Sequence, residues 1–181
     1  NPYPQDKSKA ESLVKASGHA GASITLQVPT GRYLKGVEIA QAVASQIDSL
    51  SNVSCKVKQR DFSSLANEVT DGKIKTSPHF YLLGWGNTTF DAARTITPLL
   101  TSNGPLTTYS NSQLDSYIKQ AKSEGNQQKR ASLLKKADKL AHNQAPWIFL
   151  NRQYSIYGAS KRLNWTPRRD ERIDAYSIKQ A

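Results

Sequence analysis

An arginine followed by an aromatic residue is the first combination in this sequence that could bind a charged ligand. Arg32 and Tyr33 come directly after Pro29-Thr30-Gly31, which ends an alternating run of apolar and polar residues. A cation and an aromatic face could contact a ligand there; the alternative is a turn with a solvated arginine and a packed tyrosine. Gly31 alone cannot supply the successive backbone amides of a phosphate-binding loop. Arg32 and Tyr33 are therefore candidate contacts for a ligand other than a nucleotide.

A tryptophan between two glycines forms the second candidate segment. Gly84 and Gly86 flank Trp85, and Asn87 and Thr88 follow. Glycines let the backbone come close to a ligand, while an indole presents a flat apolar wall. Trp85 could equally fill the edge of a sheet, with the glycines serving only to turn the chain. We take Trp85, Gly86, Asn87 and Thr88 as candidate ligand contacts and leave the second interpretation open.

A third polar segment, residues 107–111, leads into the start of a predicted helix. Tyr109 lies in this segment and is a further candidate ligand contact. Asn111 is better explained as the N-cap of the helix, because its side chain can accept hydrogen bonds from the first free amides. The prediction here is one contact, Tyr109, beside a structural cap.

Patterns that would indicate catalysis or metal binding are weak. No serine lies in a G-x-S-x-G turn or beside a patterned histidine, so no nucleophile has an evident base. The three histidines are scattered and Cys55 is the single cysteine, which argues against a zinc cluster. The sequence therefore predicts a binding protein rather than an enzyme, with no catalytic residue, no metal site and no cofactor.

Strands and helices alternate through the first half of the chain. Period-two or apolar runs predict strands at 23–28, 53–57 and 80–85. Amphipathic segments predict helices at 7–17, 35–50 and 62–71, with Asp6 and either Asp61 or Ser63 as N-caps and Gly18 and Gly72 as stops. Because residues 80–85 are almost continuously apolar, we expect that strand at the centre of the sheet. The alternation predicts an α/β fold with a largely parallel sheet flanked by helices.

The second half is predicted to be mainly helical and then to lose its periodicity. Two longer helices are expected to begin after Asn111 and Asn126, followed by a short strand at 147–150 and a further extended piece at 154–157. Residues 161–172 are basic and have little periodicity, so the tail lacks a core of its own.

The chain is strongly basic, and the charge is unevenly spread. Its 181 residues carry 25 Lys and Arg against 14 Asp and Glu, a formal net charge of +11. Residues 111–181 hold 14 of the basic and 6 of the acidic residues. Such charge is compatible with nucleic acid, anionic membranes or acidic ligands. No nucleic-acid motif accompanies it, and most of these side chains fit the solvated faces of helices, so nucleic acid is not expected as a partner.

The order and spacing of several short segments carry a family resemblance. These segments are Tyr3-Pro4-Gln5-Asp6, Ile24-Thr25-Leu26, Gly31-Arg32-Tyr33, Gly84-Trp85-Gly86, Tyr109-Ser110-Asn111, Ala145-Pro146-Trp147-Ile148 and Trp165-Thr166-Pro167-Arg168. Together they resemble the C-terminal lobe of a family 5 extracellular solute-binding protein, the peptide- and nickel-binding component of ABC importers. The chain contains no methionine, so we expect that Asn1 is not a translation start and that a segment has been removed by processing or cutting.

The resemblance implies one lobe of a two-lobed, type II-like periplasmic binding protein. Residues 1–150 would form the C-terminal α/β lobe, and the basic residues 151–181 would return to a missing N-terminal lobe. The implied function is capture of di- and oligopeptides between the lobes, in the periplasm or tethered outside the cell, for delivery to an ABC permease in the inner membrane. A non-peptide solute such as an opine, a metal chelate or haem is the alternative. A basic nucleic-acid-binding module is a less favoured one.

Thr88 departs from the family pattern. Peptide binders of this family usually carry an aspartate there, which pairs with the α-ammonium group of the peptide. A threonine can accept a hydrogen bond from an ammonium group but cannot neutralise it, and buried charges need neutralising partners. Asp91, three residues further along, is a possible substitute. The departure makes a free peptide N-terminus a less secure ligand group.

Overall fold

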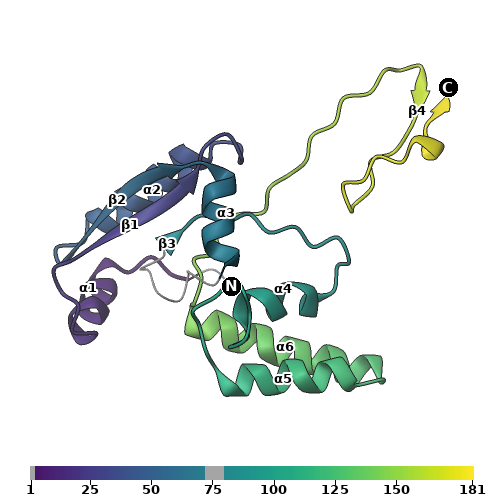
Figure 1. The fold of residues 1–181 in the computed structure, drawn as a ribbon. Helices are drawn as coiled ribbons and strands as arrows, with labels where there is room; N and C mark the ends of the chain where they lie inside the picture. Colours follow the sequence, from purple (N-terminus) through teal and green to yellow (C-terminus); the bar gives the residue numbers. More distant parts are fainter. Residues whose placement is uncertain (1–2, 72–79) are drawn as a thin grey trace. The chain divides into compact units, whose positions relative to one another are not determined.

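The computed structural model describes residues 3–71 and 80–181. The chain divides into two compact units, Asn1–Gly84 and Trp85–Ala181, each of which is described by itself. Figure 1 shows their helices and strands. No helix in the described ranges is both long and apolar enough to cross a membrane.

The first unit is built on a parallel sheet. Its elements in chain order are α1 (Lys7–Ala16), β1 (Ala22–Pro29), α2 (Gly36–Asp48), β2 (Val53–Arg60), α3 (Phe62–Thr70) and β3 (Phe80–Tyr81). The strand order is β2-β1-β3, with both neighbours parallel to β1. The predicted α/β fold with a parallel sheet is therefore confirmed.

The prediction that residues 80–85 form the central strand is wrong. Strand β3 covers only Phe80–Tyr81 and pairs with β1 on one side. β1 is the central strand, because it pairs with β2 along Ala22–Pro29 and with β3 at Leu26 and Gln27. The physical reason is that apolar content reports burial but not which neighbours a strand has, and β1 is buried along its carboxyl half.

The core of the first unit lies between the sheet and α2. It comprises Leu26, Val28, Ala40, Ala44 and Cys55, all buried. The two alanines of α2 are small, so the helix lies close against β1 and β2 (Figure 1). Burial also raises the pKa of the Cys55 thiol, which is buried at the inward strand position that the alternation predicted.

The predicted N-caps of three helices are confirmed. Asp6, Asp61 and Asn111 each accept hydrogen bonds from free amides of the helix that follows, and Asp61 rather than Ser63 caps α3. Asn126, where a helix was expected to begin, caps the helix after it in the same way. Gly18 has a positive φ of 76° just after α1, the conformation that favours glycine at a helix end. The predicted stop at Gly72 lies outside the described residues.

The second unit contains three packed helices. They are α4 (Ala92–Leu100), α5 (Ser112–Ser123) and α6 (Gln127–Gln144), and α5 and α6 lie side by side (Figure 1). Their buried residues are Ile96, Leu99, Leu100, Leu114, Ile118, Ala121, Leu134, Ala137 and Ala141. Helix α4 was not predicted, and it contains Pro98 in its last turn.

The predicted strand at 147–150 is wrong. These residues form no ladder, and Ile148, Phe149 and Leu150 are exposed. An apolar run becomes a strand only where it pairs with another strand, and this run pairs with none of the described strands. The extended piece expected at 154–157 likewise has no ladder. Instead, β4 (Leu163–Asn164) and β5 (Lys179–Gln180) form a short antiparallel pair, with a 3-10 helix, η2 (Ala175–Ser177), just before β5.

Candidate ligand site

The loop that carries Arg32 leaves the carboxyl end of the central strand. Thr30 donates to the carbonyl oxygen of Arg60 through its backbone N–H at 2.9 Å and its hydroxyl at 3.3 Å. Gly31 then adopts a positive φ of 67°, which favours glycine. In parallel sheets, ligands bind outside the carboxyl ends of the strands. The ends of β1 and β2 are thus tied together at the edge where a ligand would be expected.

Tyr33 packs against two glycines. A Cβ atom added at Gly84 would lie 2.7 Å from Cε1 of Tyr33, and one added at Gly36 would lie 3.2 Å from its Cβ. Both distances are shorter than ordinary van der Waals contacts, so the ring fits against backbone that has no side chain. Tyr33 is therefore held in place as a partly buried wall beside Arg32.

Arg32 lies between two aromatic rings. Its guanidinium carbon is 4.9 Å from the ring centre of Phe62 and 5.5 Å from that of Tyr33. These distances are within the range of cation–π attraction. Among the residues that the structure describes, no carboxylate forms an ion pair with Arg32. The guanidinium is thus oriented by rings while its charge is left unneutralised.

Sequence reasoning missed Phe62, the first residue of α3. Phe62 lies thirty positions from Arg32, and no periodicity links the two. The signal that could have found it is its place directly after Asp61, at the carboxyl end of the strand that neighbours β1. Residues at such strand ends converge on one edge of a parallel sheet.

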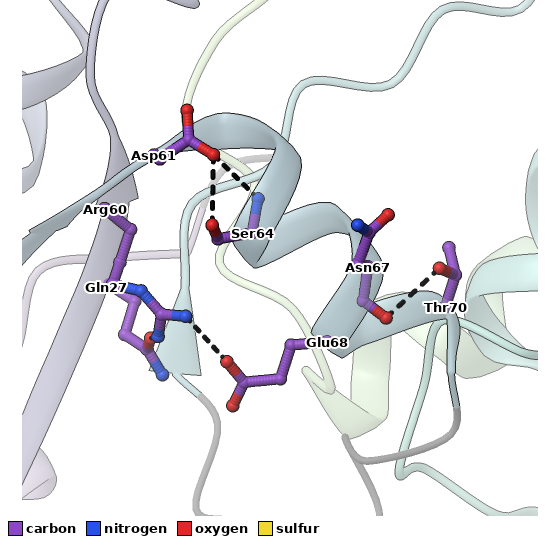
Figure 2. Close-up of polar contacts among 7 residues, drawn as sticks. All are labelled: Gln27, Arg60, Asp61, Ser64, Asn67, Glu68 and Thr70. Carbon is purple, nitrogen blue, oxygen red and sulfur yellow. Dashed lines mark hydrogen bonds and ion pairs between the residues drawn. The ribbon is translucent and has the colours of Figure 1, made fainter.

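A polar network around Arg60 fixes α3 to the sheet (Figure 2). Arg60 donates from Nη1 to the side-chain oxygen of Gln27, which is buried, and from Nη2 to Glu68 at 2.8 Å. Asp61 accepts from the N–H of Ser64 at 2.9 Å and from its hydroxyl at 3.1 Å, and the N–H bond is the first cause of the lowered pKa of Asp61. The network holds the start of α3, and Phe62 with it. Sequence reasoning gave no role to Gln27, Arg60 or Glu68.

The second candidate loop, residues 85–91, is held by its own hydrogen bonds. The amide nitrogen of Asn87 donates to the Asp91 carbonyl at 2.8 Å and to the Thr95 hydroxyl at 3.2 Å. Its amide oxygen accepts from the N–H of Thr89 at 3.2 Å and from the Thr89 hydroxyl at 3.0 Å. Asn87 therefore shapes the loop with the same atoms that a ligand contact would need.

The remaining groups of this loop are exposed. Trp85 is 37% exposed, and a Cβ added at Gly86 would meet no atom within 4 Å. Thr88 is exposed as well. Phe90, which sequence reasoning passed over, is 62% exposed and has a φ of 56°, a left-handed conformation that is rare for a bulky residue. The loop thus presents two aromatic rings and one hydroxyl.

Asp91 is bound inside the second unit. Arg130 forms a two-pronged ion pair with it, Nη1 to Oδ2 at 2.7 Å and Nη2 to Oδ1 at 3.0 Å. Asp91 also caps α4 by accepting from the N–H of Ala93 at 2.8 Å. These bonds, that from Arg130 first, lower the pKa of Asp91 below its usual range. Asp91 could take the place of the family's peptide-binding aspartate only if its ion pair with Arg130 broke.

Tyr109 lies before α5 with its hydroxyl group covered. The hydroxyl oxygen is buried and has no hydrogen-bond partner among the residues that the structure describes. Its backbone N–H donates to the hydroxyl of the buried Thr107 at 3.0 Å. A buried hydroxyl without a partner is uncommon, so Tyr109 has unused hydrogen-bonding capacity.

The predicted contacts fall into two groups by unit. Arg32 and Tyr33 lie together in the first unit. The second unit holds the other five, Trp85, Gly86, Asn87, Thr88 and Tyr109. Their roles as ligand contacts stay predictions. Among the residues that the structure describes, no cluster of three or more His, Cys, Asp or Glu side chains could hold a metal ion.

The chain is similar in sequence to bacterial glutathione-binding proteins. No protein-family model matches the chain. The glutathione-binding protein GsiB of Shigella dysenteriae serotype 1 is 27% identical over 169 residues, which cover 90% of this chain and 33% of the relative. The chain therefore spans about a third of the length of the curated relatives that it matches.

Solved structures of binding proteins have the same fold. OppA of Burkholderia pseudomallei matches with a TM-score of 0.65 and 26% identity, over 81% of this chain and 30% of that one. The ABC transporter substrate-binding protein CtaP of Listeria monocytogenes matches with a TM-score of 0.66 and 25% identity, over 79% of this chain and 29% of that one. These comparisons confirm the predicted resemblance to family 5 solute-binding proteins, and the relatives are binding proteins rather than enzymes.

Proposed function

We propose that this chain forms one lobe of a solute-binding protein that captures peptide-type ligands for an ABC importer. The observation that carries the proposal is the similarity to glutathione-binding proteins over 90% of the chain. The geometry supports it, because a cation and two aromatic rings stand at the carboxyl edge of a parallel sheet. Capture requires recognition and not a reacting group. The proposed place of action is the periplasm or the outer face of a membrane, with an ABC permease as partner.

The ligand would lie between this lobe and a second one. The relatives are about three times as long as this chain, which leaves room for another lobe. We assign residues 1–150 to the lobe and residues 151–181 to a segment that packs on its partner. Tyr154, Ile156 and Tyr176 are each at least 80% exposed. Exposed apolar surface of this kind is typical of an interaction site, which supports a covering surface elsewhere in the intact protein.

The amino group of a ligand would be recognised without a free carboxylate from the loop 85–91. Thr88 is uncharged, and Asp91 is the single acid of this loop and is paired with Arg130. An ammonium group would accordingly be met by hydroxyl and carbonyl oxygens, or by a carboxylate of the other lobe.

The uncharged Thr88 and the paired Asp91 also support the alternative function. This alternative is capture of a non-peptide solute such as an opine, a metal chelate or haem. Such a solute does not need a carboxylate at position 88. Nucleic acid is a weaker alternative, since five basic residues of α6, Lys129, Arg130, Lys135, Lys136 and Lys139, lie on its solvated side or, in the case of Arg130, pair with Asp91.

The test is a thermal-unfolding screen of the intact protein that contains this chain. A ligand that binds only the folded state raises the melting temperature. We expect glutathione or short peptides to raise it and nickel–histidine, haem and single-stranded DNA to leave it unchanged. A shift with haem or a metal chelate alone would favour the non-peptide alternative. A shift with DNA that disappears in high salt would indicate a nucleic-acid-binding module instead.

A further inference from the structure

We propose that a groove between α5 and α6 is a docking site for an acidic segment of a partner protein. The segment places one apolar side chain on the floor of the groove and carboxylates beside the lysines of its rim. This docking site goes beyond the proposed function, because the groove lies within the second unit and none of the candidate ligand contacts lines it.

The groove is formed by the two helices of the second unit that lie side by side (Figure 1). Its volume is about 230 Å³. Residues at positions i, i+3, i+4 and i+7 share one face of a helix, and the lining residues of α6 have this spacing. The groove is lined by Gln113 and Tyr117 from α5 and by Lys136, Lys139, Leu140 and Asn143 from α6.

The floor of the groove is apolar and recessed. Tyr117 and Leu140 are both half-buried, and the aliphatic stems of the lysines add apolar surface. None of the exposed large apolar side chains of the described residues lies on α5 or α6. A cavity of about 150 Å³ can hold a benzene molecule, so this groove has room for one large apolar side chain from a partner.

The rim of the groove is positively charged. The ammonium nitrogen of Lys136 lies 5.9 Å from the ring centre of Tyr117, within the range of cation–π attraction. Lys136 and Lys139 are both exposed, and neither forms an ion pair with a described residue. The amides of Gln113 and Asn143 are exposed as well and can donate hydrogen bonds. The rim is therefore complementary to carboxylates.

The acidic side chains of the two helices lie away from the groove. Each helix has a single acid, Asp115 in α5 and Asp138 in α6. Asp115 accepts a hydrogen bond from the N–H of Ser102 at 2.9 Å. Asp138 is about 100° or more around the helix from every lining residue of α6. Neither acid lines the groove, so the two lysines are left for an external anion.

An acidic peptide segment fits these features better than a membrane or a nucleic acid. Helices that bind membranes insert apolar side chains that protrude, whereas the apolar surface here is recessed. Single-stranded nucleic acid stacks its bases on aromatic rings, and Tyr117, the one ring that lines the groove, is half-buried. A segment that lays apolar side chains into a groove between helices is a common mode of peptide recognition.

The experiment measures binding of a labelled acidic peptide to the intact protein that contains this chain. The probe is Ac-Glu-Glu-Leu-Glu-Glu-Leu-Glu-Glu-amide, followed by fluorescence anisotropy at low salt, where surface charges are least screened. Two matched peptides replace either both leucines with serine or all glutamates with glutamine. We expect each replacement to weaken binding about tenfold, because one removes the apolar contact and the other the charge.

Variants of the protein test whether the peptide occupies the groove. K136Q/K139Q should weaken binding of the acidic peptide about tenfold. K119Q/K122Q is the matched control, because it removes two exposed lysines with the same spacing from another face of α5 and should leave the affinity within about twofold. L140S removes apolar floor and should reduce the advantage of the leucine peptide over the serine peptide. If L140S fails to fold, the serine peptide carries the same test on the wild-type protein.

Cross-linking then locates the bound peptide. A carbodiimide joins lysine amines to peptide carboxylates, and mass spectrometry of the digested product identifies the lysines. We expect Lys136 and Lys139 to be the main sites. Cross-links spread evenly over the exposed lysines would show non-specific attraction to a basic protein and would overturn the docking site. Equal binding by wild type and K136Q/K139Q would also overturn it.

The remaining outcomes concern other occupants of the groove. No binding of the acidic peptide, with phosphatidylglycerol vesicles or single-stranded DNA binding in a manner that K136Q/K139Q abolishes, would assign the surface to a membrane or a nucleic acid and overturn the proposal. Protection of both lysines from acetylation in the intact protein alone would show that its own chain covers the groove, with the same consequence. Solute capture is tested separately, because K136Q/K139Q should keep the wild-type thermal shift with glutathione.

Discussion

The two candidate loops use their polar groups in opposite ways. In the loop after β1, Arg32 is oriented by aromatic rings and has no described acid partner. In the loop before α4, Asn87 and Asp91 are saturated by bonds within the second unit. The first loop therefore has a charge without a described acid partner, whereas the second uses its polar groups to hold a shape.

The difference separates two kinds of recognition. A loop with an unneutralised cation selects for an anionic group. A loop that presents Trp85, Thr88 and Phe90 selects for apolar surface and hydrogen bonds. Asn87 and Asp91 have partners within the second unit, so changes at these two residues should appear first as lost stability, while the contacts of Asn87 and Thr88 with a ligand stay predictions. The following predictions test that contrast, from the largest expected effect to the smallest.

Replacing Arg60 with leucine should give the largest loss of stability. It would leave the buried Gln27 oxygen without the Arg60 donor and would remove the ion pair between Arg60 and Glu68. Unsatisfied buried polar groups are costly, and we expect a loss of about 2–3 kcal/mol in chemical denaturation. The matched control is K58L on the same strand, at an exposed position. Equal losses in the two variants would show that the network does not hold α3.

Replacing Gly84 with alanine should disturb the first loop through Tyr33. The new Cβ would lie 2.7 Å from the ring, so the ring must move, at a cost of about 1–2 kcal/mol. Gly86 is the control two residues away, since a Cβ there meets no atom within 4 Å. G84A should also weaken the binding of glutathione or short peptides by the intact protein, measured by calorimetry, if Tyr33 contacts the ligand. Identical melting temperatures for G84A and G86A would contradict the packing of Tyr33.

Replacing Asp91 with alanine should destabilise the second unit by about 1–2 kcal/mol, since it removes both the cap of α4 and a partly exposed ion pair. D91N keeps a capping oxygen and should lose less. Denaturant unfolding measures both. If Asp91 instead binds the ligand, both variants would lose ligand affinity with little change in the free energy of unfolding. That result would contradict the contrast between the loops.

The stability that the Asp91 contacts contribute should depend on pH, and this is the smallest of the expected effects. Arg130 and the N–H of Ala93 lower the pKa of Asp91 in the folded state, below the ordinary value of about 3.9. The stabilisation is therefore present above that value and is lost as pH falls through the lowered pKa. The stability difference between wild type and D91N should shrink between neutral pH and acid below about pH 4. A constant difference would contradict it.

Local features of this chain were readable from the sequence. Asp6 and Asn111 were recognised as caps, because a cap depends on residues at most three positions away. The paired arginine and tyrosine at 32 and 33 were recognised because they follow a strand.

Non-local features were not readable. Strand order depends on partners that the apolar run at 80–85 does not reveal. Phe62 contacts Arg32 across thirty residues, and Arg130 reaches Asp91 across thirty-nine. Helix α4 was missed because Pro98 is usually a helix breaker, although here it lies in the last turn.

The most direct test of peptide capture is mass spectrometry of the small molecules released when the intact protein, purified gently from its native host, is denatured. The account predicts peptide-type molecules, and their loss when the R32Q variant is purified in parallel. A single non-peptide species, retained equally by wild type and R32Q, would contradict it.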